Sequence, residues 1–237
     1  MDVKEITLLG DSQENHWYYV SKSRALLAAV GDRRVERIAD VGAGSGYFSK
    51  MLLRTTDADR AVCIDPGYTS DRLEMYLGKP LEFRHQGSIA NADLVLLMDV
   101  LEHVDDDVGL VRKLAASANQ RTRFVISVPA FSWLWSRHDE FLEHRRRYTL
   151  NGILRVIAAG GLSPVSGFYA FAAIFPAVAA KRLWARVSMR SDAPKSDLRR
   201  HHPWTNSLLT RVCLAECAIA RYNRVFGLTA FVVAEKL

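Results

Sequence analysis

The sequence contains few cysteines. It has 3 among 237 residues, and no two of them form a Cys-x-x-Cys pair. A disulfide-stapled scaffold and a zinc ribbon are therefore excluded, and so sparse a count is typical of a reducing compartment. The N-terminal stretch MDVKEITLLGDSQEN has no apolar run after its positive charge, so we expect no signal peptide and a cytoplasmic protein.

Long apolar runs are also scarce. The stretch Val156–Ala180 carries no charge, but turn-forming residues interrupt it: Gly160, Gly161, Pro164 and Gly167. Its remaining part, Phe168–Ala180, is shorter than the roughly 20 residues that a helix needs to cross a bilayer. We expect the end of a strand and then a buried or interfacial helix there. With 49% hydrophobic and 24% charged residues, the chain can form a full core, which excludes disorder and low-complexity architectures.

Charge is unevenly distributed along the chain. Residues 1–120 hold 14 Lys and Arg against 19 Asp and Glu, whereas residues 121–237 hold 18 against 7. The whole chain carries a formal net charge of +6. The basic half therefore indicates contact with something anionic, which could be a phosphate, an acidic lipid surface or a nucleic acid.

The first 130 residues alternate short apolar runs with amphipathic segments, which is the pattern of βαβ units in a parallel sheet. Strands are predicted at Arg37–Val41, Ala61–Asp65, Leu81–His85, Ala92–Val100 and Arg123–Val128. Helices are predicted at Tyr47–Arg54, Asp105–Ser117, Leu150–Ala159 and Asn206–Phe226, and a closing strand at Leu228–Lys236. A polar, basic linker is expected at Ser191–Pro203. Thr149 is the expected cap of the helix that begins at Leu150.

The segment DVGAGSGYFS is the strongest motif in the chain. Three of its glycines lie where a strand turns into a helix and let the backbone approach a ligand closely: Gly42, Gly44 and Gly46. Their spacing is G-x-G-x-G. The position where a dinucleotide fingerprint needs its third glycine is Tyr47, and no Lys-Ser/Thr pair follows as in a P-loop.

Two aspartates flank this loop. Asp40 precedes it, where an anion disfavours a pyrophosphate but favours a ligand with a positive ammonium group. Asp65 ends the next predicted strand, where doubly wound folds place a carboxylate that accepts hydrogen bonds from ribose hydroxyls. Together they predict a nucleoside with a cationic tail and no phosphates, which is S-adenosylmethionine.

The segment Ile38–Val128 resembles the class I S-adenosylmethionine-dependent methyltransferases. IADVGAGSG is similar to their glycine-rich motif, AVCID to their ribose-binding motif, and DLVLLMDVLEHV to their fourth-strand motif. The resemblance implies an α/β, Rossmann-like, doubly wound fold with a seven-stranded, mostly parallel sheet. Its last strand runs antiparallel, and a helical insertion of roughly 170–227 precedes that strand. A single domain, 1–237, is implied, with a cofactor-binding half (1–130), an acceptor-side part (131–227) and a closing strand (228–237).

The resemblance also implies the cofactor contacts. The three glycines approach the cofactor, Asp40 lies near its amino group and Asp65 binds its ribose. Where the family usually has an Asp followed by an apolar residue beside the adenine, this chain has Ser88 and Ile89. The remaining expected contacts with the cofactor are Asp99 and His16.

Two further segments are similar to one bacterial subgroup of these enzymes. HWYYVSKSR (His16–Arg24) looks like an aromatic N-terminal helix that closes over the cofactor. VPAFSWLWSRHDEFLEHRRRYT (Val128–Thr149) looks like the subgroup's signature after the fifth strand. Because members often accompany sugar- or lipid-modifying enzymes, the implied acceptor is a small molecule, a glycan or a lipid-linked glycan that is methylated on oxygen or nitrogen.

Methyl transfer from a sulfonium is an in-line displacement, in which a base removes the proton of an acceptor hydroxyl. The candidate bases lie at the carboxyl edge of the predicted sheet: His103, His138, Asp139 and His144. Glu102 and His103 could instead contribute to the cofactor side of the site. His138, Asp139 and His144 could form a hydrogen-bond network that organises their loop. No metal is expected, because the pair His138 and His144 lacks a nearby Cys or third His. The run Arg145–Arg147 could clamp a carboxylate or phosphate, or two of its three side chains could form a solvated face.

The apolar and basic segment 168–190 has three interpretations. It could lie on an acidic membrane surface at the inner face of the membrane, cover the acceptor pocket as a lid, or form a homodimer surface. We favour the lid or dimer. Nucleic acid is disfavoured, because no RNA-binding motif or recognition helix appears. An RNA-modifying methyltransferase and a non-catalytic cofactor-binding module remain the alternative functions.

Overall fold

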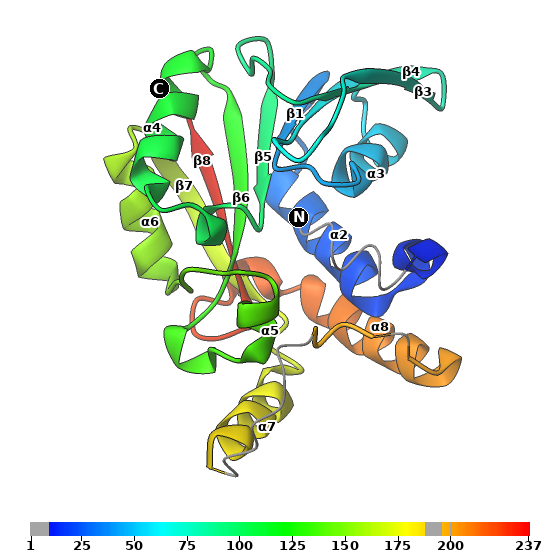
Figure 1. Ribbon diagram of the computed structural model, residues 1–237, viewed down its shortest axis with the longest axis vertical. Helices are drawn as coiled ribbons and strands as arrows, with labels where there is room; N and C mark the ends of the chain where they lie inside the picture. The colour runs from blue at the N-terminus through cyan, green and yellow to red at the C-terminus, as the bar shows by residue number, and fades with distance from the viewer. Residues whose placement is uncertain (1–9, 188–195, 200) are drawn as a thin grey trace.

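An eight-stranded mixed sheet forms the centre of the computed structural model across residues 10–187, 196–199 and 201–237, the part of the chain that the structure describes (Figure 1). The strand order is β3-β4-β2-β1-β5-β6-β8-β7. The strands are β1 (Arg37–Val41), β2 (Arg60–Ile64), β3 (Arg72–Tyr76), β4 (Lys79–Arg84), β5 (Leu94–Met98), β6 (Arg123–Pro129), β7 (Ser163–Ala170) and β8 (Thr229–Glu235). β4, β2, β1, β5 and β6 run parallel, and β8 runs antiparallel between β6 and β7.

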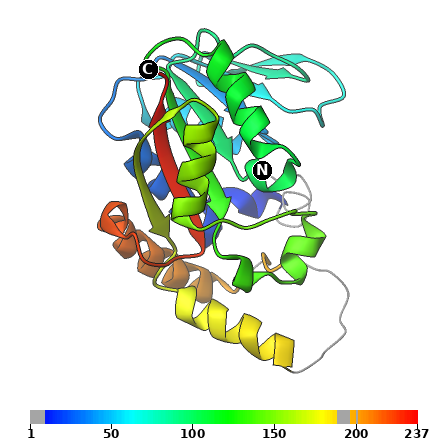
Figure 2. The ribbon, with the colours of Figure 1, turned by 90° about the vertical axis from the view of Figure 1, so that its left-hand side faces the viewer.

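The helices lie on both faces and at one end of this sheet (Figures 1 and 2). The α-helices are α2 (Trp17–Val30), α3 (Tyr47–Thr55), α4 (Asp107–Ser117), α5 (Arg137–Phe141), α6 (Leu150–Ala159), α7 (Phe175–Val187) and α8 (Pro203–Cys217). Short 3-10 helices are η1 (Gly10–Asn15), η2 (Leu101–His103), η3 (Ser132–Leu134) and η4 (Ala220–Tyr222). Among the described helices, none combines the length and the apolar character that a membrane crossing requires.

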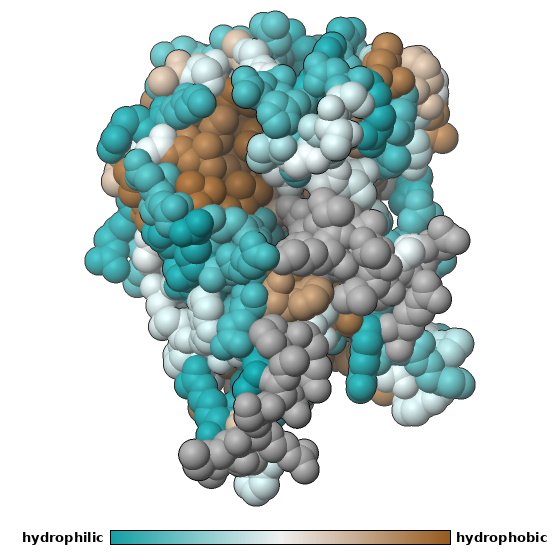
Figure 3. Space-filling model, viewed as in Figure 1, coloured by the Kyte–Doolittle hydropathy of each residue, from teal (hydrophilic) through white to brown (hydrophobic). Residues whose placement is uncertain are grey.

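Two apolar cores lie on opposite faces of the sheet, because successive side chains of a strand point in opposite directions. In β5, Leu94 and Leu96 pack with α2 and α3, whereas Val95 and Leu97 pack with α4 and α6. Every residue of β5 is buried, as expected for a central strand with helices on both sides. Beside α4, apolar side chains remain visible at the surface (Figure 3).

The expected seven-stranded sheet is corrected to eight strands in the described residues. The additional strand is β3, which forms an antiparallel hairpin with β4. Leu77 and Gly78 make its two-residue turn with φ angles of 53° and 75°. β3 alternates Leu73 and Met75 with charged residues, but both apolar side chains are exposed, so the strand is not one of the buried apolar runs from which the other strands are predicted. The antiparallel last strand and the helical insertion before it, which holds α7 and α8, are confirmed.

Helix ends follow local capping. α6 begins and ends as predicted, and Thr149 Oγ1 accepts a hydrogen bond of 3.1 Å from the Gly152 amide. α8 starts earlier than predicted, with Pro203 in its first turn, and ends at Cys217 rather than Phe226. The chain continues as η4, after which Asn223 Nδ2 donates to the carbonyls of Tyr169 and Phe226 and holds the chain against β7. Residues 191–195 and 200 of the predicted linker and residues 188–190 of the basic segment lie outside the described residues.

Candidate active site

Three glycines shape the loop between β1 and α3. Their φ angles are 71°, 56° and 72° at Gly42, Gly44 and Gly46, in the left-handed region that favours glycine. A Cβ atom added to Gly42 would lie 2.6 Å from Cγ2 of Val100, and one added to Gly46 would lie 3.0 Å from the Phe83 ring. The predicted turn from strand to helix is confirmed, and the first glycine has no room for a side chain.

Asp40 lies in β1, just before the glycine loop, with 1% of its surface exposed. Its Oδ2 accepts a hydrogen bond of 2.9 Å from Ser49 Oγ. Burial raises the pKa of Asp40 to about 6, because the bond from Ser49 offsets only part of the lost hydration. The carboxylate is therefore charged at neutral pH, and its field acts on the loop from the interior.

Asp65 follows β2 and holds the glycine loop from the other side. Its Oδ2 accepts a hydrogen bond of 2.9 Å from the Gly44 amide, and its Oδ1 accepts one of 2.8 Å from the Gly67 amide. Tyr68, which sequence reasoning missed, donates its hydroxyl to the Gly44 carbonyl at 2.6 Å. Each carboxylate oxygen has two lone pairs, so Asp65 can still accept further hydrogen bonds.

A cavity of about 670 Å³ opens beyond the carboxyl ends of β5 and β6, the edge where open α/β sheets bind ligands. Asp99, Glu102 and His103 reach it from the segment after β5, and Pro129 from the end of β6. Its apolar lining is Trp17, Tyr18, Leu142, Ile174, Ala177, Val178, Leu198, Leu209 and Leu228. Its basic and imidazole lining is His138, His144, Arg147, Lys181, Arg182, Arg199 and His201.

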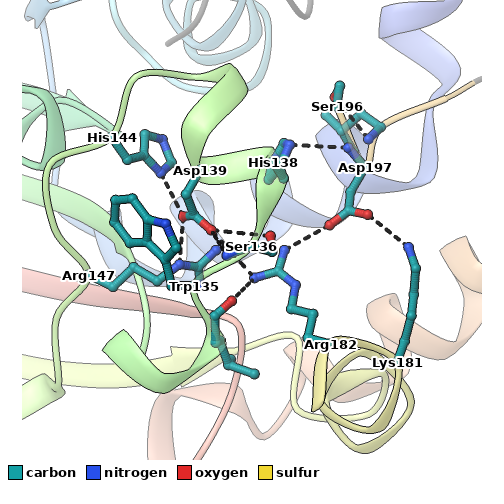
Figure 4. Close-up of polar contacts among 12 residues, drawn as sticks. Trp135, Ser136, His138, Asp139, His144, Arg147, Lys181, Arg182, Ser196 and Asp197 are labelled. Carbon is teal, nitrogen blue, oxygen red and sulfur yellow. Dashed lines mark hydrogen bonds and ion pairs between the residues drawn. The ribbon is translucent and has the colours of Figure 1, made fainter. Parts of the chain in front are cut away.

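Asp139 is the centre of a buried polar network next to this cavity (Figure 4). Its Oδ1 lies 2.9 Å from Nδ1 of His144 and accepts a bond of 2.6 Å from Arg147 Nε. Its Oδ2 accepts a bond of 2.8 Å from the Ser136 amide. Burial alone would raise the pKa of Asp139, but the bonds from His144 and Arg147 outweigh it and hold the pKa well below its usual range. Asp139 is therefore a poor proton acceptor, which corrects its place among the candidate bases.

His138 also differs from its expected role as a base. Its Nδ1 accepts a hydrogen bond of 3.1 Å from the Asp197 amide, so its proton is on Nε2. Burial lowers the pKa of His138 to about 4, which keeps the ring neutral at physiological pH. Asp197 in turn accepts bonds of 2.8 Å from Lys181 and 2.9 Å from Arg182, which tie α7 to this segment (Figure 4).

His144 is the histidine whose orientation suits proton transfer or ligand binding. Because Asp139 is an ionised acceptor, His144 Nδ1 must donate to it, and Nε2 keeps the lone pair. The His144 ring lies edge-on to the His103 ring, with centroids 4.8 Å apart. Glu102 completes this group, since ligand-type atoms of these three residues lie within 4.8 Å of one another. The structure therefore brings all four candidate bases together around His144: Asp139 binds its Nδ1, and the rings of His103 and His138 lie 4.8 and 6.5 Å from its ring.

Comparison with known proteins identifies the family. A family model described as "Methyltransferase domain" matches residues 13–168, which is more than half of the chain. The chain belongs to this methyltransferase domain family. A comparison with curated proteins finds no match.

Solved structures share the fold of this methyltransferase domain protein at low sequence identity. A chain from the complex between the Haloferax volcanii Trm112 methyltransferase activator and its methyltransferase has a TM-score of 0.56 at 15% identity, covering 98% of this chain and 94% of that one. The [4+2]-cyclase SpnF has a TM-score of 0.53 at 13% identity, covering 91% and 80%. Haemonchus contortus phosphoethanolamine N-methyltransferase 2, solved with S-adenosyl-L-methionine, has a TM-score of 0.52 at 12% identity, covering 100% and 60%. Such likeness concerns the fold alone.

Of the expected cofactor contacts, only Asp99 is among the described residues that line the cavity; Ser88, Ile89 and His16 lie elsewhere, as do the three glycines, Asp40 and Asp65. Ser88 is exposed, and its Oγ accepts a hydrogen bond of 3.2 Å from the Ala90 amide. Ile89 is buried in the core that faces α4 and α6. His16 caps α2: its Nδ1 accepts from the Tyr18 amide at 3.4 Å, and its Nε2 lies 3.1 Å from the Arg199 carbonyl. Both nitrogens of His16 therefore have structural partners, and its contact with a cofactor stays a prediction.

A buried ion pair between Lys22 and Asp99 connects α2 to the site. Lys22 is 0% exposed and binds both Asp99 Oδ2 and, at 2.9 Å, the Tyr18 hydroxyl. Asp99 Oδ1 accepts a bond of 3.0 Å from Ser127, and its backbone has a φ of 55°. Burial raises the pKa of Asp99, but the charge and the hydrogen bond of Lys22, together with the bond from Ser127, outweigh burial and hold the pKa below its usual value. Sequence reasoning missed Lys22, although a lysine on a mostly apolar aromatic helix indicates a hidden partner.

The arginine run is not an open anion clamp. Arg145 binds Asp105 and donates to the His103 carbonyl at 2.8 Å. Arg146 lies 3.2 Å from Asp107, and Arg147 binds Asp139. All three arginines bind carboxylates of the protein itself. The run therefore organises the acceptor-side loop through these ion pairs.

Proposed function

We propose that this protein transfers a methyl group from S-adenosylmethionine to an oxygen or nitrogen atom of an amphipathic, anionic small-molecule or lipid-linked acceptor. The observation that carries the proposal is the 670 Å³ cavity beyond β5 and β6, which has an apolar wall and a basic rim. Ligands of open α/β sheets bind at this edge. The family match to a methyltransferase domain supports the reaction class.

The residues around the glycine loop fit this cofactor. Three left-handed glycines bring the backbone close to a ligand, Asp65 keeps free lone pairs for ribose hydroxyls, and Asp40 supplies a negative charge for an ammonium group. S-adenosylmethionine, when bound, supplies a methyl group on a positively charged sulfur. A structural neighbour was solved with this molecule, which supports the assignment.

The acceptor is expected to be apolar over most of its length and to carry an anionic group. Trp17, Tyr18 and Ile174 offer apolar surface, whereas the exposed Arg199 and the half-buried His201 offer positive or hydrogen-bonding groups. The acceptor's reacting hydroxyl or amine would lie near Glu102, His103 and His144. Asp139 orients the His144 ring, so that the lone pair on Nε2 is available to the acceptor.

The insertion supports access from a lipid surface. Trp184 on α7 and Trp204 on α8 are 75% and 65% exposed, and Leu208 is exposed one turn after Trp204. Arg186 and Arg211 are exposed on the same two helices. Exposed tryptophans beside arginines are typical of helices that lie on anionic membranes. This arrangement favours a lipid-linked acceptor and a peripheral position at the membrane, with a lid or a dimer as the rival uses of these helices.

Transfer of tritiated methyl groups from S-adenosylmethionine tests the proposal. The full chain is incubated with three fractions of a cell extract: aqueous metabolites, total lipids and RNA. Label in the lipid or metabolite fraction is expected. Label in RNA alone would establish the RNA-modifying alternative, and cofactor binding without label in any fraction would establish a non-catalytic module.

Vesicle co-sedimentation tests the lipid-surface part. Vesicles with anionic phosphatidylglycerol should bind the wild-type chain, whereas the pair Trp184→Ala and Trp204→Ala should weaken binding. Leu73→Ala, on the exposed strand β3, is the matched control and should leave binding unchanged. Equal binding by all variants would contradict membrane contact through α7 and α8. If light scattering shows the molar mass of the protein rising to twice that of one chain as the protein concentration is raised, the dimer would be favoured.

A further inference from the structure

The carboxylate of Glu102 is buried without a hydrogen-bond partner. The residue is 0% exposed, and neither Oε1 nor Oε2 has a partner among the residues that the structure describes. A buried carboxylate is normally paired with a cation, hydrogen-bonded or bound to a metal, because removing it from water is costly. The position of Glu102 at the cavity therefore requires an explanation that the proposed methyl transfer does not itself supply.

Two imidazole rings lie next to this carboxylate. Glu102 and His103 come from the 3-10 helix η2 after β5, and His144 comes from the loop after α5. Potential ligand atoms of the three lie within 4.8 Å of one another. Ligands of a tetrahedral zinc ion at ordinary bond lengths lie about 3.3 Å apart. Side-chain rotations that bring these atoms about 1.5 Å closer together would therefore place them at the spacing of zinc ligands.

The surrounding structure holds this group in place. The Arg145 amide donates to the Glu102 carbonyl at 2.8 Å, and Arg145 Nε donates to the His103 carbonyl at 2.8 Å. The two segments that carry the three side chains are therefore fastened together. Asp139 fixes the tautomer of His144 so that Nε2 is the free ligand atom. A carboxylate behind a histidine is the usual arrangement at zinc sites, where it orients the ring and raises its basicity.

We propose that Glu102, His103 and His144 bind a divalent transition-metal cation, with Zn²⁺ as the best fit. Two imidazoles and one carboxylate favour Zn²⁺, Co²⁺ or Fe²⁺ over Mg²⁺ and Ca²⁺, which prefer oxygen ligands only. Three protein ligands leave a coordination position open, as in catalytic rather than structural zinc sites. All three residues line the 670 Å³ cavity, so the open position faces the acceptor.

The proposed role of the cation rests on the proposed function. An acceptor hydroxyl whose oxygen binds the cation loses its proton more readily, since the positive charge stabilises the alkoxide. The O–H bond would break and its proton would pass to water, while the oxygen would keep the electron pair that forms the new bond to the methyl carbon. The carbon–sulfur bond would break in the same step, and its electron pair would stay on the sulfur of the departing S-adenosylhomocysteine. The sequence-based expectation of no metal considered only His138 and His144 as a pair of ligands. The proposed site instead uses Glu102, His103 and His144. His138 is outside it because its Nδ1 is bound to the Asp197 amide.

Zinc binding by the purified, untagged full chain tests the site without acceptor or cofactor. After treatment with a chelator, the protein is dialysed against Zn²⁺ and its metal content is measured, and Co²⁺ is added in parallel to follow the visible spectrum. One zinc per chain is expected, together with Co²⁺ absorption bands of a four- or five-coordinate site. Glu102→Gln and His144→Ala should each weaken zinc binding at least tenfold.

Controls keep the result interpretable. His202→Ala removes an exposed histidine at the start of α8, outside the cavity, and should bind zinc as the wild type does. Thermal unfolding of each variant shows whether it is folded, and Glu102→Gln keeps the shape of the side chain. Binding that is absent, or unchanged in both Glu102→Gln and His144→Ala, would overturn the site. Zinc binding without methyl transfer would refute only the proposed function, and methyl transfer by a protein that binds no zinc would refute only this inference.

Discussion

Replacing Lys22 by methionine should destabilise the protein by about 3 kcal/mol. Removing one partner of a buried ion pair leaves an uncompensated charge, which costs about 3–5 kcal/mol. The Lys22 side chain is 1% exposed and that of Asp99 is 22% exposed. Because water can reach part of Asp99, and Ser127 still donates to it, we take the lower end of that range.

Urea unfolding measures this change as a difference in the free energy of unfolding. In a domain of this size, about 3 kcal/mol corresponds to a fall in melting temperature of roughly 6–12 °C. Lys181→Met is the matched control, because its pair with Asp197 is at the surface, where an ion pair is worth about 1 kcal/mol or less. The double variant Lys22→Met with Asp99→Asn should recover part of the loss, since no lone charge remains. A loss for Lys22→Met no larger than that for Lys181→Met would refute the reasoning.

Three further results are expected. Affinity for S-adenosylmethionine should fall as pH drops from 7 to 5, since Asp40, with a pKa of about 6, loses its charge over that window. Calorimetry at several pH values checks this. The variant Asp40→Asn should bind weakly, and its affinity should not change with pH over the same window. His144→Ala should slow methyl transfer about a hundredfold or more, whereas His138→Ala should slow it less than tenfold; equal rates for both variants in the tritium assay would contradict the assignment. Gly42→Ala should lower the free energy of unfolding by about 1–2 kcal/mol more than Gly31→Ala does, as measured by urea unfolding. Both glycines have a positive φ, but only a Cβ at position 42 would meet another side chain. Equal losses of stability would show that Val100 moves aside.

Much of the fold could be predicted from periodicity and capping. β1, β2, β5, β6 and β8 are buried apolar runs, and the bounds of α6 follow from a Thr cap before it and glycines after it. β3 is not predicted in this way, because it is a short alternation of charged and apolar residues rather than a continuous apolar run, and its pairing with β4 depends on a two-residue turn. The return of the chain to β7 after α8 depends on a contact far apart in the sequence, since Asn223 Nδ2 donates to the carbonyl of Tyr169.

In the candidate site, too, the local features could be predicted from the sequence and those that depend on tertiary contacts could not. The glycine loop and Asp65 could be predicted, because the motif occupies one short stretch of sequence and its turn is local. The roles of the histidines could not, since they depend on which nitrogen of each ring is already bonded. Asp197, 59 positions from His138 in the sequence, binds the nitrogen that His138 would need as a base, whereas Asp139 leaves Nε2 of His144 free. The burial of Lys22 against Asp99 is likewise visible only once α2 packs beside β5.

Competitive calorimetry tests the central claim most directly, namely that the glycine loop and its two aspartates bind an adenosyl sulfonium. S-adenosylhomocysteine should bind the wild-type chain, and neither NAD nor ATP should displace it. Asp65→Ala should weaken this binding by about 1.5–3 kcal/mol, the usual value of hydrogen bonds to a charged group. Saturable binding of NAD or ATP with no competition from S-adenosylhomocysteine, or undiminished affinity in Asp65→Ala, would contradict the account.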